Sequence, residues 1–216
     1  MSRAPLPPPL PPETRTVGQL VAETLRLYGR RFWRSLALGV PVAAVNMLAV
    51  ELPPAARLAV IPLVSGVVLT VVLVAASMIA LERRPESLGT ALAGGFVVFL
   101  LFPLLVGVFV LPGFVWLALF GLIVPAAVTE RLSLMEGFAR ALALGRADFV
   151  HALGSLATLA ILVFLTQATL LVLLQAQGEQ AAQIASFLAG AVVSPILFLG
   201  AALLYLDQAA RYRVKT

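Results

Sequence analysis

The uncharged stretch from residue 91 to residue 128 constrains the fold more than any other part of the sequence. At 1.5 Å per residue, a single helix of this length would be nearly twice as long as a hydrocarbon core about 30 Å thick. Near the middle, Leu111-Pro112-Gly113 predicts a break, because proline and glycine interrupt helices. The stretch therefore predicts two membrane-spanning helices joined by a tight turn.

The composition of the whole chain also points to a bilayer. The chain is 61% hydrophobic and 12% charged, whereas about 25% of the residues in a soluble domain are charged. Too few polar residues are present to cover a surface in water. The absence of cysteine from the sequence excludes disulfides and thiolate metal sites. The net charge of +5 lies in short basic clusters between apolar runs, which favours anionic lipid headgroups over nucleic acid as the partner.

Six apolar stretches, each near the length that a bilayer requires, predict six transmembrane helices in an all-α polytopic membrane helix bundle. This six-helix membrane domain is expected over residues 16–210, after a disordered Pro-rich tail over 1–15 and before a basic tail over 211–216. The predicted spans are about 34–50, 57–81, 91–111, 113–129, 149–174 and 183–206. The prolines inside these spans, which are expected to bend the helices, are Pro41, Pro62, Pro103, Pro125 and Pro195.

The distribution of basic residues predicts the orientation of the bundle. If the N-terminus lies inside the cell, every Lys and Arg except Arg57 falls on the cytoplasmic side, and the external loops carry Glu51 and Glu179 instead. Cytoplasmic loops of membrane proteins carry such an excess of Lys and Arg. Both termini are therefore expected in the cytoplasm, and the chain is expected to be a multi-pass protein of a bacterial plasma membrane.

An internal repeat precedes the first and fifth spans. Residues 16–36 align without gaps on residues 133–153, and each copy predicts a short helix that runs directly into a span. In the first copy, apolar residues and arginines occupy different helix faces, which is typical of an amphipathic helix in the headgroup layer. The repeat predicts two interfacial helices, each followed by a helical hairpin, with a central hairpin between them. Both copies open with a predicted capping box, formed by Thr16 with Gln19 and by Ser133 with Glu136.

The same segments resemble a known family. The resembling features are residues 16–36, Pro112-Gly113, Pro125 with Glu130, the sequence LMEGFARALALGR from Leu134, and Tyr205-Leu206-Asp207. Together they resemble the glycerophosphoryl diester phosphodiesterase membrane-domain family of bacterial and archaeal six-helix proteins, which is similar in style to the YciC-like membrane proteins. A serine that often lies in the middle of the helix after Glu130 is absent, since Ala141 follows Arg140. The resemblance implies the six-helix fold and, in some members, an attached phosphodiesterase, which we do not expect within these 216 residues.

The sequence offers no recognisable catalytic set. Phosphodiester hydrolysis requires histidines and carboxylates that hold a metal and protonate the leaving group, and His151 is the single histidine. A Ser-His-Asp arrangement, a Gly-rich phosphate loop and carboxylate pairs at metal-ligand spacing are all missing. We therefore expect no enzymatic activity, and no catalytic, cofactor-binding or metal-binding residues.

The polar residues inside the spans leave two interpretations open. Asn46 and Gln167 are expected at similar depth in the outer leaflet, where they could hydrogen-bond across the bundle or line a pathway. The small residues Ser186, Gly190 and Ser194 repeat every four positions, which allows a close helix approach either within the bundle or between two copies of the chain, so the oligomeric state stays open.

Three functions follow from these features. The first is a membrane anchor, scaffold or modulator of a partner, with an anionic lipid surface and another membrane protein as partners. The second is a transporter or permease-like protein for a lipid or small apolar molecule, which predicts a cavity lined by Asn46 and Gln167. The third, a membrane-embedded lipid-modifying enzyme, requires His151, Glu130 and Asp207 to gather around one pocket.

Overall fold

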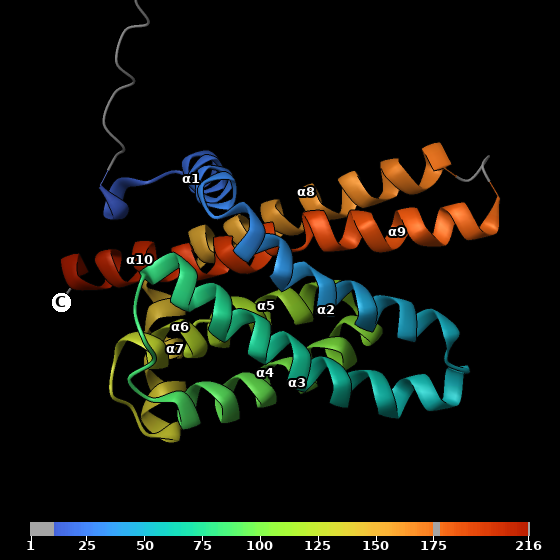
Figure 1. Ribbon diagram of the computed structural model, residues 1–216. Coiled ribbons are helices and arrows are strands. Elements are labelled where there is room, and N and C mark those ends of the chain that lie inside the picture. Colours follow the sequence, from blue (N-terminus) through green and yellow to red (C-terminus); the bar gives the residue numbers. More distant parts are fainter. Residues whose placement is uncertain (1–10, 175–177, 216) are drawn as a thin grey trace, which may run out of the picture.

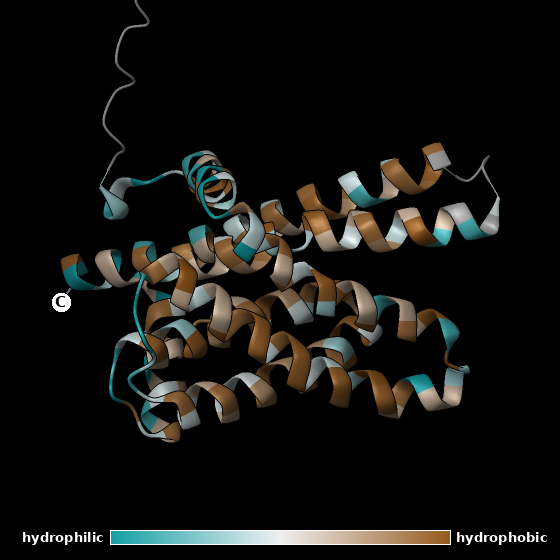
Figure 2. Cartoon of the chain, viewed as in Figure 1, coloured by the Kyte–Doolittle hydropathy of each residue, from teal (hydrophilic) through white to brown (hydrophobic). Residues whose placement is uncertain are grey.

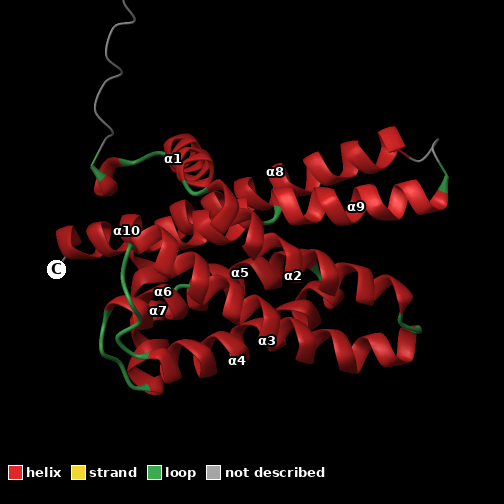
Figure 3. Ribbon diagram, in the orientation of Figure 1, coloured by secondary structure: helices red, strands yellow, loops and turns green. Residues whose placement is uncertain are grey.

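The computed structural model describes residues 11–174 and 178–215, so most of the predicted Pro-rich tail lies outside the described residues. The described chain is helical, without strands (Figures 1 and 3). Its elements are η1 (Pro12–Thr14), α1 (Val17–Arg30), α2 (Phe32–Glu51), α3 (Pro54–Leu81), α4 (Leu88–Val108), α5 (Val110–Phe120), α6 (Ile123–Thr129), α7 (Leu134–Ala147), α8 (Phe149–Leu174), α9 (Glu179–Val193) and α10 (Pro195–Lys215).

The predicted all-α bundle with six potential membrane spans is confirmed for the described residues. Four of these spans are the single helices α2, α3, α4 and α8, and each of the other two is made from a pair of successive helices, α5 with α6 and α9 with α10. Hydrophobic residues predominate along the middle of these helices, and hydrophilic residues are more frequent toward their ends (Figure 2). The chain is therefore a multi-pass membrane protein by the length and composition of its helices.

The reversal between the third and fourth spans lies earlier than predicted. Helix α4 ends at Val108 and α5 begins at Val110, so the extended residue Phe109 makes the break. Pro112 lies in the first turn of α5, where a helix tolerates proline because the first amides have no intrahelical acceptor. Gly113 packs against the side chain of Val106 in the preceding helix. Pro112 thus lies in the first turn of α5, and Gly113 lets α5 pack closely against α4, but neither residue forms the turn.

Two of the five prolines expected to bend spans instead lie in the first turn of a new helix. The fourth span is interrupted at Gly121-Leu122, and Pro125 lies near the start of α6. The last span is interrupted at Ser194, and Pro195 is the first residue of α10. The other three prolines lie within α2, α3 and α4, as predicted.

The two copies of the repeat have the same helix boundaries. Helices α1 and α7 occupy aligned positions, and so do the first residues of α2 and α8. Both predicted capping boxes are formed. The Gln19 side chain accepts from the Thr16 amide at 2.8 Å, and the Glu136 side chain accepts from the Ser133 amide at 2.8 Å. A local sequence signal therefore sets the start of each short helix.

The span formed by α9 and α10 is the most buried, and its second helix, α10, contacts α1, α3, α7 and α8, whereas α8 is largely exposed on the protein surface. Residues 211–215 continue α10 through Lys215, so the predicted basic tail is the end of a helix over these residues.

On α1, the buried side chains are Leu20, Thr24 and Leu27, which lie one helical turn apart. These residues place α1 against α10 and α8.

Helices α2 and α9 approach each other closely through small residues, as the small-residue pattern on α9 predicts. A β carbon added to Gly39 would coincide with the backbone carbonyl of Ala191. One turn further along α2, Ala43 packs against Gly190, the residue before Ala191 on α9, with 3.3 Å between the ideal β-carbon position of Gly190 and the alanine β carbon. Small residues at such contacts let two backbones pack closely where no hydrophobic effect drives helices together.

We predict that Gly39→Ala lowers the free energy of unfolding by about 1–3 kcal/mol, because the added methyl group forces α2 and α9 apart. The control is Gly154→Ala in α8, where a β carbon would meet no atom within 4 Å. Reversible unfolding in detergent micelles measures both variants. Equal stability of the two variants would contradict the close contact.

Candidate functional site

Most ion pairs of the described chain gather at one end of the bundle, which we call the charged end. It comprises α1, the loops α3–α4 and α6–α7, the α7–α8 junction and the last turns of α10, on the left of Figures 1 and 2. Charge pairs join neighbouring helices and loops at this end. The pairs are Arg15–Asp207, Arg31–Glu82, Arg131–Glu86, Arg140–Glu130 and Arg211–Asp148.

Among the charged side chains of the described residues, that of Asp207 is fully buried. Its carboxylate accepts a hydrogen bond from the Arg15 guanidinium at 2.8 Å. Arg211 donates a hydrogen bond to the backbone carbonyl of Arg15 at 2.7 Å. Residues 11–15 therefore pack against α10, and the predicted unpacked tail is wrong for this part. The physical reason is that a buried carboxylate requires a charged partner, which the start of the chain supplies.

Glu130 belongs to a second cluster at the charged end. Its carboxylate accepts two parallel hydrogen bonds from Arg140, with donor–acceptor distances of 3.0 Å and 2.9 Å. The hydroxyl of Tyr205 donates to the same carboxylate at 2.9 Å and accepts from Thr129 at 2.6 Å. The ring of Tyr212 lies 5.0 Å from the Arg140 guanidinium, close enough for a cation–π contact. This network joins α6, α7 and α10.

The junction of α7 and α8 is fixed by Asp148. The Gln208 side chain accepts from the amide of Asp148 at 3.2 Å and donates to its carbonyl at 3.0 Å. Burial pushes the pKa of the Asp148 carboxyl upward, but the amide of His151 and the guanidinium of Arg211 outweigh burial and lower it. Hydrogen bonds from the Ser133 amide and hydroxyl likewise lower the pKa of Glu136 in the capping box of α7. Both carboxylates favour the ionised state.

The structure brings together only two of the three residues that a lipid-modifying enzyme would use. The His151 Nε2 atom lies 3.5 Å from the Asp207 carboxylate, without a hydrogen bond. Glu130 instead lines a surface cleft to which neither His151 nor Asp207 contributes. Among the described residues, no three His, Cys, Asp or Glu side chains could jointly hold a metal ion. The required gathering around one pocket is therefore not observed.

Two clefts open at the charged end, and they share Arg83. The tyrosine cleft, with a volume of about 560 Å³, lies between α3, α7 and α10 beside Glu130 and Tyr205. The arginine cleft, with a volume of about 530 Å³, lies between the start of α2 and the end of α3. The arginine cleft is lined by Arg31, Arg34, Ala75, Met78, Ile79, Glu82, Arg83 and Arg84.

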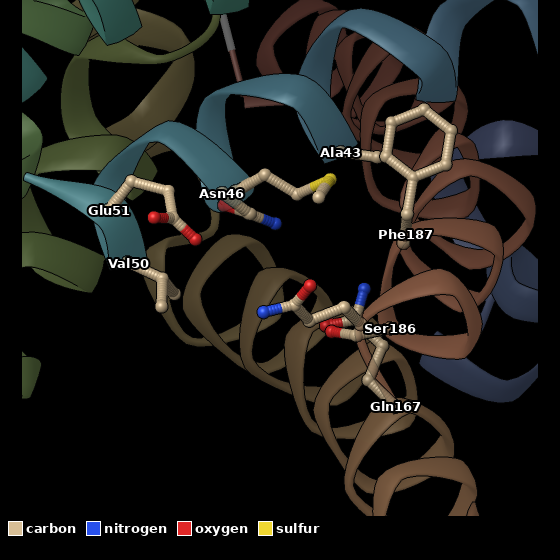
Figure 4. Close-up of a pocket in the computed structure, with 10 residues that line it drawn as sticks. Ala43, Asn46, Val50, Glu51, Gln167, Ser186 and Phe187 are labelled. Atoms are coloured by element: carbon tan, nitrogen blue, oxygen red, sulfur yellow. The ribbon is translucent and has the colours of Figure 1, made fainter. Parts of the chain in front are cut away.

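A pocket at the opposite end of the spans is lined by Asn46 and Gln167, as the transporter hypothesis predicts. We call it the amide pocket; its volume is about 140 Å³, and α2, α8 and α9 surround it (Figure 4). The alternative prediction, a hydrogen bond between these two amides, is wrong. The structure gives neither side chain a hydrogen bond to a described residue.

The sequence pattern also contains pocket residues that the prediction missed. Gln183, Ser186 and Gly190 lie on one face of α9, at spacings of three and four, and all three line the amide pocket. Ser186 and Gly190 were expected only to allow close packing. Glu51, at the end of α2, completes the polar lining. Gln183 precedes Ser186 by three positions, so an amide one helical turn before the small-residue pattern is the sequence signal that could have identified it.

No protein-family model, curated protein or solved structure matches the chain. The resemblance to the glycerophosphoryl diester phosphodiesterase membrane-domain family therefore remains a prediction, and the function must be argued from the geometry of this chain.

We predict that Asp207→Ala lowers the free energy of unfolding by about 3–5 kcal/mol, because it leaves Arg15 buried without a counter-charge. The Arg15 side chain is 11% exposed. The matched control, Glu86→Ala, removes a surface pair with Arg131 and is expected to cost at most about 1 kcal/mol. Unfolding in detergent measures both variants, and similar losses would contradict the special role of Asp207.

Proposed function

We propose that this chain is a non-catalytic protein of the bacterial plasma membrane that binds anionic phospholipid with its charged end and serves as an anchor, scaffold or modulator for a partner membrane protein. The observation that carries the proposal is the arginine cleft. Arg34, Arg83 and Arg84 line it without an ion pair to any described residue.

The lining of the arginine cleft matches the chemistry of a phospholipid. The three free guanidinium groups suit a phosphate, because arginine presents several donors in a planar fork. Deeper along α3, Ala75, Met78 and Ile79 offer an apolar wall, which suits the start of an acyl chain. Basic pockets between transmembrane helices on the cytoplasmic side bind anionic headgroups in this manner.

In this proposal the charged end faces the cytoplasm, and α1 and α7 lie in the headgroup layer. The excess of Lys and Arg at this end supports the orientation. Exposed apolar residues on both helices support contact with lipid: Leu25 is 46% exposed and Met135 is 80% exposed. Catalysis is left out of the proposal because the one histidine faces Asp207 and lies outside the clefts.

We predict that Arg34→Gln/Arg84→Gln weakens binding of phosphatidylglycerol about thirtyfold, since each arginine near the membrane surface contributes about 1 kcal/mol. The measurement is native mass spectrometry of the protein from phosphatidylcholine nanodiscs titrated with phosphatidylglycerol. The matched control is Arg146→Gln, which removes an exposed charge on α7 outside both clefts. Equal binding by the double variant and the control would reject the arginine cleft as the site.

The orientation can be tested directly because the chain has no cysteine. The variant Arg84→Cys places a thiol in the α3–α4 loop at the charged end, and Glu51→Cys places one at the other end of the spans, where α2 ends. Both positions are exposed. We expect a membrane-impermeant maleimide to label position 51 in intact cells, and position 84 only after the membrane is opened. Labelling of position 84 in intact cells would reject the proposed orientation.

The amide pocket favours a second candidate function, a transporter or permease-like protein for a lipid or small apolar molecule. Such a protein needs polar side chains inside its spans, and Asn46 and Gln167 are two such residues that face a pocket. Flux through the reconstituted protein that disappears when both amides are replaced would favour this function over the first.

A further inference from the structure

We infer that the amide pocket binds the neutral, hydroxyl-rich headgroup of a lipid, such as the sugar of a glycolipid. This inference depends on the pocket alone and goes beyond the proposed function, because it requires neither the arginine cleft nor transport. It assigns a ligand class to a site at the end of the bundle opposite to the charged end.

The first argument is that the polar side chains of the pocket lack partners. Asn46, Gln167, Gln183 and Ser186 form no hydrogen bond with a described residue, although all four line the same space. Figure 4 shows Asn46 on α2 and Gln167 on α8 on opposite sides of that space. Some hydroxyls in the spans, such as that of Thr166, donate to a carbonyl of their own helix, while those of Ser35, Ser155 and Ser194 are buried singly without a partner. The amide pocket differs because it gathers four unpartnered polar side chains around one space. The pocket residues therefore keep their hydrogen-bonding capacity free for another molecule.

The second argument is the kind of hydrogen bond that these groups make. Each amide side chain offers both donors and an acceptor, and a serine hydroxyl does the same. A sugar or polyol hydroxyl also donates and accepts, so several adjacent hydroxyls can satisfy Asn46, Gln167 and Gln183 together. A phosphate suits the pocket poorly, because Glu51 is the charged side chain in its described lining and its carboxylate repels anions.

The third argument concerns size and surroundings. A volume of about 140 Å³ is well below the roughly 300 Å³ at which pockets for whole drug-sized ligands begin, so only a headgroup fits. Apolar side chains that are exposed on the protein surface flank the pocket. Met47 is 39% exposed and Val50 is 73% exposed on α2, and Ile184 and Leu188 are each 55% exposed on α9. These residues lie on helices that can span a bilayer, so they would contact acyl chains in a membrane. A ligand whose headgroup fills the pocket would therefore extend a lipid tail along them.

The test uses phosphatidylcholine nanodiscs that contain monoglucosyl diacylglycerol, with binding to the full chain measured by native mass spectrometry. We expect Asn46→Leu/Gln167→Leu to bind the glycolipid about thirtyfold more weakly, since it removes two hydrogen-bonding groups at about 1 kcal/mol each. The control is Thr169→Val, which changes a polar residue of α8 outside the pocket. Unchanged binding by the double variant would overturn the inference.

A second variant keeps the test valid if the double variant fails to fold. Ser186→Leu retains all the amides but fills the space, so it is also expected to weaken glycolipid binding about tenfold.

Three further ligands separate the alternatives. Equal binding of plain diacylglycerol would reject headgroup recognition, equal binding of phosphatidylglycerol would reject the preference for a neutral headgroup, and equal binding of free glucose would reject a lipid as the ligand.

Discussion

Hydrocarbon gives a polar group no hydrogen-bonding partner, and this constraint determines where the polar atoms of the bundle lie. Within the spans, Thr70 and Ser77 donate to carbonyls of their own helix. The buried charge of Asp207 lies at the charged end and is paired with Arg15. The amide pocket is unusual because it gathers several polar side chains without a partner in the described chain around one space, among them Asn46 and Gln167. That contrast is why we assign a ligand to the pocket.

The features that could be predicted from the sequence depend on local signals. An apolar run is long enough to span a bilayer whatever surrounds it, and a capping box needs only two residues three positions apart. The six spans and the starts of α1 and α7 were predicted for this reason. The reversal at Phe109 was not, because Pro112 fits equally well inside a span, at a turn or in the first turn of a helix, and only packing selects among these.

The candidate sites depend on contacts between distant segments, so the sequence predicted them only in part. Asn46 and Gln167 were placed at one depth and do line one pocket, but the contribution of α9 to that pocket and the absence of a hydrogen bond between the two amides follow from tertiary packing. Composition indicated that residues 11–15 would be unpacked, since proline-rich segments rarely form a core. The buried Asp207 overrides that tendency through Arg15. Orientation, lipid binding and the family resemblance remain predictions.

The pair formed by Arg15 and Asp207 also affects the order in which the protein assembles. The two residues are 192 positions apart, so Arg15 leaves the ribosome long before its partner is made. Helix α1 cannot adopt its final position against α10 until the last span has been inserted. During synthesis, the N-terminal segment therefore stays without its partner until the final helix is complete, and that step closes this end of the protein.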